Sequence, residues 1–299
     1  MRLFAEVRLE AGERTAAQRG HAAYFMIVAA AGDDLYLQGG ESLKKALALF
    51  DAEWVNFQAG QVWAAAHASK DDAAAKLCNA FPDAGAYCLA LRQHPRDGIR
   101  WLEAALAAAR QLKNRGAEGA HLGNLGLAYF SLGGSRRAVE YYEQALAISR
   151  EIGGWRGEGQ VLGNLGNAYH SLGEYRRAID YHEQRLKIAR EIGDRRGEGN
   201  ALGNLGLAYD SLGEYRRAIE YHELNLQIAR EIGDQRGEGN ALWNMSLAFD
   251  MLGERAQAIA HAETALKILE QIESPNAARV RAQLVAWRRE GEGRGHSAG

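Results

Sequence analysis

The sequence has few of the residues that break helices, form disulfide scaffolds or span membranes. It has three prolines in 299 residues, and proline is the strongest helix breaker. The two cysteines, Cys78 and Cys88, are too few for a disulfide scaffold, so we expect buried thiols in a cytoplasmic protein. No run of about 20 apolar residues is present, which excludes a membrane-spanning helix.

Charge of one sign is also scarce. The formal net charge is −2, so the chain lacks the positive excess that nucleic-acid binding requires. Arg2, Glu6, Arg8 and Glu10 interrupt the N-terminal segment, which therefore lacks the pattern of a secretory signal peptide. We expect neither nucleic acid nor membrane as a partner.

The sequence repeats itself with a period of 40 residues. Residues 156–195 and 196–235 differ at nine of 40 positions, and weaker copies begin at Gly123 and Trp243. Such a period indicates a solenoid, in which each unit buries its apolar face against its neighbours. We therefore expect four repeats over residues 113–272, an all-α fold, and recognition of partners along a surface.

Each repeat is predicted to be a helical hairpin. Leu162, Leu165 and Tyr169 recur at i, i+3 and i+7, which places them on one face of a first helix. Gly173 ends that helix. A second apolar stripe begins at Ala178 and belongs to the returning helix.

These residues resemble the tetratricopeptide repeat (TPR) signature. From Leu162 the sequence reads L-x2-L-G-x2-Y, and from Ala178 it reads A-x3-H. The resemblance implies a right-handed α-solenoid in which Gly166 and Ala178 are the small residues where two helices cross. The 40-residue unit is similar to the repeats of Pins/LGN-type polarity adaptors and of bacterial signalling proteins.

The segments outside the four repeats are also predicted to be helical. Residues 73–112 fit the same period as a degenerate TPR hairpin, and Ser274-Pro275 provides an N-cap and first turn for a capping helix within 273–290. Residues 291–299 are Gly-rich, and we expect disorder there. Residues 1–72 should form four helices: Phe4–Gln18, His21–Ala31, and two between Glu41 and Ala68.

The N-terminal region is similar to the connector between the ATPase module and the TPR sensor of STAND-type signalling ATPases. No G-x-x-x-x-G-K-[ST] phosphate loop is present, so any ATPase would have to lie outside this chain. The resemblance rests on scattered residues: Glu6, Arg8, His21, Tyr24, Phe25, Glu53 and Asn56.

Differences between the repeats indicate which face binds. In the first helix, positions 160, 167 and 170 vary and share a face opposite the apolar stripe. In a TPR superhelix this face lines the concave groove, although drift of an unpacked surface would give the same pattern. The groove positions are Ala120, Leu127 and Phe130, then Gln160, Asn167 and His170, then Asn200, Leu207 and Asp210, then Asn240, Leu247 and Asp250.

One groove position is constant. Asn124, Asn164, Asn204 and Asn244 recur at the 40-residue period, and each amide has one acceptor and two donors for the backbone of an extended peptide. The TPR resemblance implies this role, while a hydrogen bond to the neighbouring helix is the alternative. The predicted peptide-binding residues are Asn124, Asn164, Asn204, Asn244, Asn167, His170, Asn200, Leu207, Asp210, Asn240, Trp243 and Asp250.

Other residues refine this hypothesis. Gly123, Gly163 and Gly203 adjoin the asparagines and allow close approach of either a ligand or a helix, while Trp243 would wall off one end of the groove. Arg185 and Asn225 replace small inward residues, and we expect hydrogen bonds to neighbouring repeats because a lone buried charge is costly.

The groove face predicts some of the ligand's chemistry. It has no Lys or Arg for a TPR carboxylate clamp, which argues against an adaptor for chaperone tails. Asp210 and Asp250 favour a ligand with basic and apolar residues.

The pattern does not favour an enzyme, a metal site or a cofactor. His182 and His222 occupy equivalent places two helix layers apart, too far for one metal ion. His170 and Asp210 could form an acid–base pair across the groove, but no motif places a nucleophile beside them. Besides a peptide-binding scaffold, the alternatives are a sensor module of a signalling ATPase and a self-assembling scaffold.

Overall fold

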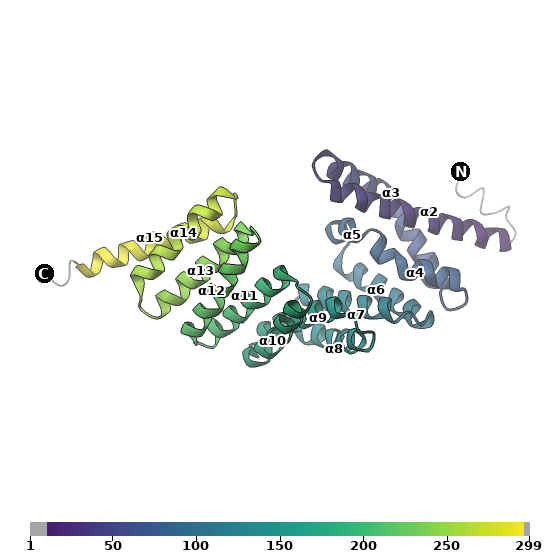
Figure 1. Ribbon diagram of the computed structural model, residues 1–299. Helices are drawn as coiled ribbons and strands as arrows, with labels where there is room; N and C mark the ends of the chain where they lie inside the picture. Colours follow the sequence, from purple (N-terminus) through teal and green to yellow (C-terminus); the bar gives the residue numbers. More distant parts are fainter. Residues whose placement is uncertain (1–10, 296–299) are drawn as a thin grey trace. The chain divides into compact units, whose positions relative to one another are not determined.

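The computed structural model describes residues 11–295, which form fourteen helices and no strand. The chain divides into two compact units, Met1–Gly153 and Gly154–Gly299, and each is described by itself (Figure 1). The first contains α2 to α8 and the second contains α9 to α15. The fold is therefore all-α and built from repeated helical hairpins, as the 40-residue period predicts.

The first unit begins with two long helices, where the sequence predicts four short ones. Helix α2 spans Ala11–Gln38 and α3 spans Gly40–His67. No proline occurs within either range, and a lone glycine such as Gly20 costs only about 1 kcal/mol inside a helix, so the expected breaks do not form. The part of the predicted Phe4–Gln18 helix that precedes Ala11 lies outside the described residues.

The degenerate repeat is a hairpin with a broken first arm. Its helices are α4 (Asp72–Ala84), α5 (Ala86–Arg92) and α6 (Pro95–Gln111). The break falls at Gly85, where the Asp33 carboxylate accepts hydrogen bonds from the backbone N–H groups of Tyr87 and Cys88. This side chain from α2 satisfies donors that a continuous helix would pair internally.

The first clear repeat completes this unit. It consists of α7 (Arg115–Ser131) and α8 (Ser135–Glu151). Cys78 and Cys88 are free and buried, as expected, and burial raises the pKa of each thiol to about 11. No helix of residues 11–295 is long and apolar enough to cross a membrane.

The second unit contains three further hairpins and a last helix. Its helices are α9 (Trp155–Ser171), α10 (Tyr175–Glu191), α11 (Arg195–Ser211), α12 (Tyr215–Glu231), α13 (Gln235–Met251), α14 (Arg255–Gln271) and α15 (Asn276–Gly295). Consecutive helices pack on one another from α9 to α15. Stacking of this kind produces one continuous core along the unit.

The apolar stripe predicted from the sequence forms the core. Leu162 and Leu165 are fully buried and Tyr169 nearly so, and Ala178 packs below them. The turn between the two helices needs a left-handed residue, which Gly173 provides with φ 76°.

Helix α15 covers the end of this stack. Its residues Val280, Leu284 and Trp287 are buried against α13 and α14. The sequence predicts an end near Glu290, but the helix continues to Gly295, since no proline stops it. The rest of the predicted disordered tail, residues 296–299, lies outside the described residues.

Candidate functional site

We call the four asparagines that recur at the 40-residue period the ladder asparagines, and three of them lie in the second unit, on alternate helices. Asn164 is on α9, Asn204 on α11 and Asn244 on α13, and all three are half-buried. The fourth, Asn124, is exposed on α7 in the first unit. The 40-residue period therefore places one amide on each first helix of the second unit's hairpins.

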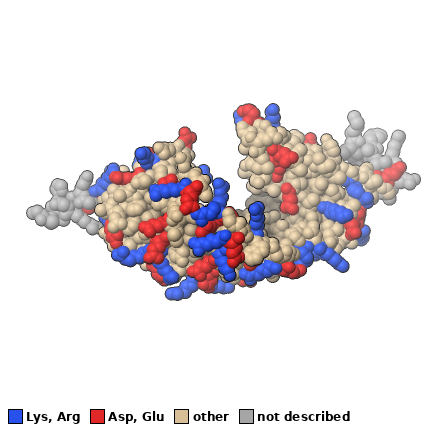
Figure 2. Space-filling view, viewed as in Figure 1, with Lys and Arg blue, Asp and Glu red and all other residues tan. Residues whose placement is uncertain are grey.

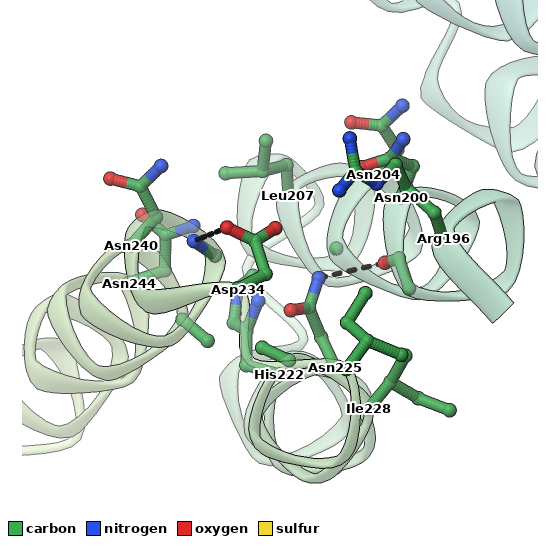
Figure 3. A pocket seen from close by; sticks show the side chains of 16 residues that line it. Arg196, Asn200, Asn204, Leu207, His222, Asn225, Ile228, Asp234, Asn240 and Asn244 are labelled. Carbon is green, nitrogen blue, oxygen red and sulfur yellow. Dashed lines mark hydrogen bonds between the residues drawn. The ribbon is translucent and has the colours of Figure 1, made fainter.

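Two cavities adjoin these asparagines, and they occupy equivalent places in successive repeats. One, of about 550 Å³, lies among α9, α10 and α11 and includes Asn164. The other, of about 190 Å³, lies among α11, α12 and α13 and includes Asn204 and Asn244 (Figure 3). We call them the α9–α11 cavity and the α11–α13 cavity.

The linings of the two cavities share ten equivalent positions, eight of them with the same residue. The shared pairs are Arg156/Arg196, Gly159/Gly199, Asn164/Asn204, Ile188/Ile228, Ala189/Ala229, Ile192/Ile232, Asp194/Asp234 and Gly197/Gly237. The lining differs at two equivalent pairs, Gln160/Asn200 and Arg185/Asn225. Gly193 and Arg195 line only the α9–α11 cavity, and six residues line only the α11–α13 cavity: Gly203, Leu207, His222, Asn240, Ala241 and Asn244. Among the shared positions, the charge differs only at Arg185/Asn225.

The Asn225 side chain is fixed within its own hairpin. Its Nδ2 donates to the Gly199 carbonyl oxygen of α11 at 2.7 Å, as the dashed line in Figure 3 shows. The predicted bond to a neighbouring repeat is therefore wrong for Asn225, because the carbonyl of the paired helix is nearer. Among residues 11–295 Arg185 makes no hydrogen bond, so the prediction is wrong there too.

The ladder asparagines differ in what they bond. Asn204 Nδ2 donates to Asn167 Oδ1 of the preceding first helix at 3.1 Å, which is the alternative that the sequence left open. Within the described part of the chain, Asn164 and Asn244 make no hydrogen bond. Their amides, and the acceptor oxygen of Asn204, have bonding capacity left for a ligand.

The positions four residues before the ladder asparagines also line the cavities. Gln160, Asn200 and Asn240 do so, together with Leu207. Asn240 Oδ1 also accepts a long hydrogen bond, 3.3 Å, from Asn276 Nδ2 at the start of α15. These residues agree with the predicted groove face.

Other predicted site residues belong to the packing of the unit instead. Trp243 is 6 % exposed and lies against Trp287 of α15, with ring centroids 6.3 Å apart. It is therefore part of the core and does not wall off the groove. The small Ala265, equivalent to Arg185 and Asn225, leaves space there for a large ring.

The two aspartates that suggested a basic ligand are already bonded. Asp210 Oδ2 lies 3.0 Å from His222 Nε2. Asp250 accepts from Trp287 Nε1 at 3.0 Å and pairs with Arg255 at 2.9 Å. Each carboxylate thus has partners within the protein, a cationic one only for Asp250, and neither lines a cavity described above.

The acid–base pair of His170 and Asp210, which the sequence did not favour, does not form. His170 Nε2 lies 3.0 Å from Ser211 Oγ, and its ring packs beside Tyr175. Asp210 is instead bonded to His222, as above. Of the remaining groove positions, Leu127 is exposed on α7 and Leu247 is half-buried on α13.

The charge of the α9–α11 cavity was missed from the sequence. Its lining includes Arg156, Arg185, Arg195 and only one carboxylate, Asp194. The prediction considered cations on the groove face of the first helices alone, whereas Arg156 and Arg195 lie at the N-terminal ends of α9 and α11 and Arg185 reaches the cavity from α10. The signal was present, since Arg185 stands where the other repeats have Ala145, Asn225 and Ala265.

Outside this cavity, neither sign of charge dominates. Figure 2 shows Lys and Arg interspersed with Asp and Glu on the visible face of each unit. Several charged residues form ion pairs between successive helices, such as Arg190 of α10 with Glu198 of α11. An excess of positive charge in one cavity is therefore a local feature.

A buried histidine below this cavity makes stability depend on pH. His182 is 1 % exposed and its Nδ1 has no partner among the described residues. Burial, with a smaller effect of Arg185, lowers the pKa of His182 from 6.5 to about 3. Protonation thus favours the unfolded chain, and the stability present above pH 6.5 falls as the pH drops toward 3, by up to ~1.4 kcal/mol per pH unit.

This dependence can be measured by urea unfolding at about pH 7 and about pH 5.5. We expect His182→Tyr to reduce the loss of stability between these pH values, because the equivalent residue Tyr142 is accommodated against Gly126 in the first clear repeat. An equal loss in both proteins would assign the pH dependence to other groups.

Comparison with known proteins agrees with this geometry. The tetratricopeptide repeat model matches residues 85–151, 138–191, 157–224 and 198–271. No curated protein matches the sequence.

Several solved structures share the fold. BtubC (BKLC) from P. vanneervenii is similar with a TM-score of 0.61 and 21 % identity, over 71 % of this chain and 92 % of that one. Aspartyl phosphate phosphatase F from Bacillus subtilis is similar with a TM-score of 0.64 and 14 % identity, over 90 % and 78 %.

A third similar structure is the STAND protein with a tetratricopeptide repeat sensor from Pyrococcus horikoshii. Its TM-score is 0.60 with 16 % identity, over 78 % of this chain but only 37 % of that protein. At these identities the likeness concerns the fold alone. Because the family model covers more than half of the sequence, the chain belongs to the tetratricopeptide repeat family.

Proposed function

We propose that this chain is a binding scaffold, without catalysis, that holds an extended peptide segment of a partner protein along α9, α11 and α13. The observation that carries the proposal is the polar cavity that recurs with the repeat and adjoins Asn164, Asn204 and Asn244. Solenoids use such periodic surfaces to bind extended ligands.

The chemistry of the lining suits a peptide backbone. A peptide presents alternating N–H donors and C=O acceptors, and an amide side chain can serve both. Cavity-lining Gln160, Asn200 and Asn240 add further amides beside the ladder. Because these groups are neutral, they fix the position of a backbone without selecting its side chains.

The ligand's side chains are a separate matter. The sequence favours basic and apolar residues, but Asp210 is already bonded to His222, and Asp250 to Arg255 and Trp287. Exposed Leu207 still favours an apolar contact at the α11–α13 cavity. The expected preference for basic ligand residues therefore loses the two carboxylates on which it rested.

Selection from a random peptide display library tests the proposal. We expect enriched peptides to bind the Asn164→Ala/Asn204→Ala variant about 10-fold more weakly, since each neutral hydrogen bond contributes about 0.5–1.5 kcal/mol. Affinity is measured by fluorescence anisotropy, with circular dichroism to verify that the helices are intact.

The matched control is Gln184→Ala, which removes an exposed amide of α10 that lines neither cavity. It should bind like the unaltered protein. Enriched peptides that bind both variants equally well would show that the cavities are not the binding surface, and no enrichment would remove the peptide-binding proposal.

A second candidate is a regulatory module of a STAND-type signalling ATPase. It is favoured by the likeness to a STAND protein with a TPR sensor, which this chain matches over 37 % of that protein's length. In this role ligand binding would change contacts with an ATPase. Co-purification with an ATPase that depends on the N-terminal helix α2 would favour it over an independent scaffold.

A further inference from the structure

Arg185 is a half-buried charge for which the fold provides no acceptor. It extends from α10 across Gly163 of α9, and a Cβ atom at Gly163 would lie 2.9 Å from its Cδ and Cζ atoms. Because Gly163 has no side chain, the Arg185 guanidinium can occupy the space beside α9. Burial lowers the pKa of Arg185 and only Asp194 opposes this effect.

The other charges of the α9–α11 cavity do not neutralise it. Arg195 is paired with Glu198 and Glu231. The Asp194 carboxylate accepts a hydrogen bond from the Gly197 backbone at the start of α11, at 2.8 Å. Arg156 is exposed and makes no ion pair within residues 11–295. Arg156 and Arg185 thus face one carboxylate that already has a structural partner.

The equivalent cavity provides an internal comparison. There Asn225 replaces Arg185 and finds an acceptor in the Gly199 carbonyl oxygen. The charged residues of that lining are one arginine, Arg196, and one aspartate, Asp234. A neutral, internally bonded residue can therefore take the place of Arg185, and a half-buried arginine without an acceptor is particular to the α9–α11 cavity.

We infer that the α9–α11 cavity binds a carboxylate of the peptide ligand, with Arg185 as the donor. The carboxylate belongs either to an Asp or Glu side chain or to the C-terminus of the ligand. A planar guanidinium can give two parallel hydrogen bonds to such a group. Asn164 and Gln160, in the same lining, can donate to the peptide beside it. This inference rests on the proposed peptide-binding function and names the ligand group that its first cavity selects.

Peptide selection tests the specificity. Peptides selected on the unaltered protein should be enriched in Asp, Glu or a free C-terminal carboxylate, and those selected on Arg185→Asn should not. For a selected peptide, changing the acidic residue to its amide, or amidating the C-terminus, should weaken binding about 10-fold. The change that weakens binding identifies which carboxylate is bound.

The chain offers matched variants for this experiment. Arg185→Asn copies the α11–α13 cavity into the α9–α11 cavity, and it removes a poorly solvated charge, so we expect the variant to be at least as stable. Asn225→Arg makes the reverse change and should add a preference for a second acidic residue. If selected peptides bind both variants and the unaltered protein with equal affinity, the proposed peptide-binding function is retained but the carboxylate site is overturned.

A small anion tests the site without any peptide. Glutarate is titrated while the Nε–Hε signal of Arg185, assigned by its absence in Arg185→Asn, is followed by nuclear magnetic resonance. A saturable shift of this signal, with no comparable shift for Arg190, supports the site even if no peptide is selected. An unchanged Arg185 signal overturns it. Failure of the peptide selection alone would count against the proposed function only.

Discussion

Replacing Trp287 by alanine is expected to lower the free energy of unfolding of the second unit by about 3–5 kcal/mol, the cost of truncating a fully buried tryptophan. Trp287 is 1 % exposed, and its ring packs beside that of Trp243. Its Nε1 donates to Asp250, which Arg255 also contacts. The substitution would therefore leave a cavity and an unpaired carboxylate oxygen at the same place.

The size of this effect follows from the repeat architecture. Each hairpin buries its apolar face on the next one, and within residues 11–295 the last hairpin is covered by the single helix α15. Weakening α15 exposes the end of the stack, and fraying can then pass inward from repeat to repeat.

Urea unfolding followed by far-ultraviolet circular dichroism measures the loss. The control is Val285→Ala on the same helix, whose side chain is 43 % exposed and whose truncation should change stability by no more than about 0.5 kcal/mol. Similar midpoints for both variants would show that α15 does not stabilise the unit.

The same variant addresses the self-assembly alternative. An exposed apolar end should make the mass of Trp287→Ala rise with concentration in light scattering, while the capped protein stays constant. A mass that already rises in the unaltered protein would favour a scaffold that stacks end to end.

The sequence was sufficient for the repeated part of the fold. The spacing of Leu162, Leu165 and Tyr169 predicts one buried helical face, and all three are buried. Gly173 marks the turn because a left-handed φ favours glycine. These features depend on local periodicity and backbone preference, which a single sequence contains.

The sequence was not sufficient to predict whether a helix continues past a glycine, or which partner a polar side chain bonds. The isolated Gly20 looks like a helix end in the sequence, but packing of α2 on α3 offsets its small cost. Whether Asp210 faces a ligand or His222 depends on how α11 and α12 cross, and the sequence pattern does not give that geometry. Arg185 could be recognised as unusual, but its direction into the α9–α11 cavity requires the structure.

The sequence predicts a close helix crossing at the small residues Gly166 and Ala178, and Ala178 is fully buried. The sequence did not predict that the ring of His182 lies against Gly166 and that of His222 against Gly206. In the last repeat the equivalent residues are Ser246 and Ala262, both fully buried. At these helix crossings a glycine therefore faces a histidine ring, or two small residues, Ser246 and Ala262, face each other.

Replacing Gly206 by alanine is accordingly expected to destabilise the second unit by about 2 kcal/mol, within the range for overpacked cores. The new Cβ atom would lie 2.5 Å from Nδ1 of His222. That ring cannot easily move aside, because it is fully buried and bonded to Asp210. In contrast, Gly123→Ala should stabilise by up to about 1 kcal/mol, since a Cβ there meets nothing within 4 Å and alanine favours the helix.

A double-mutant cycle decides whether the crossing causes this loss. His222→Ala alone should destabilise by leaving a cavity and an unpaired Asp210. Adding Gly206→Ala to it should then cost little or be favourable, because two small residues already face each other at Ser246 and Ala262. Urea unfolding of the four proteins gives a coupling energy of at least about 1 kcal/mol if the Cβ and the ring compete for one space. Purely additive losses would place the cost of Gly206→Ala elsewhere in α11.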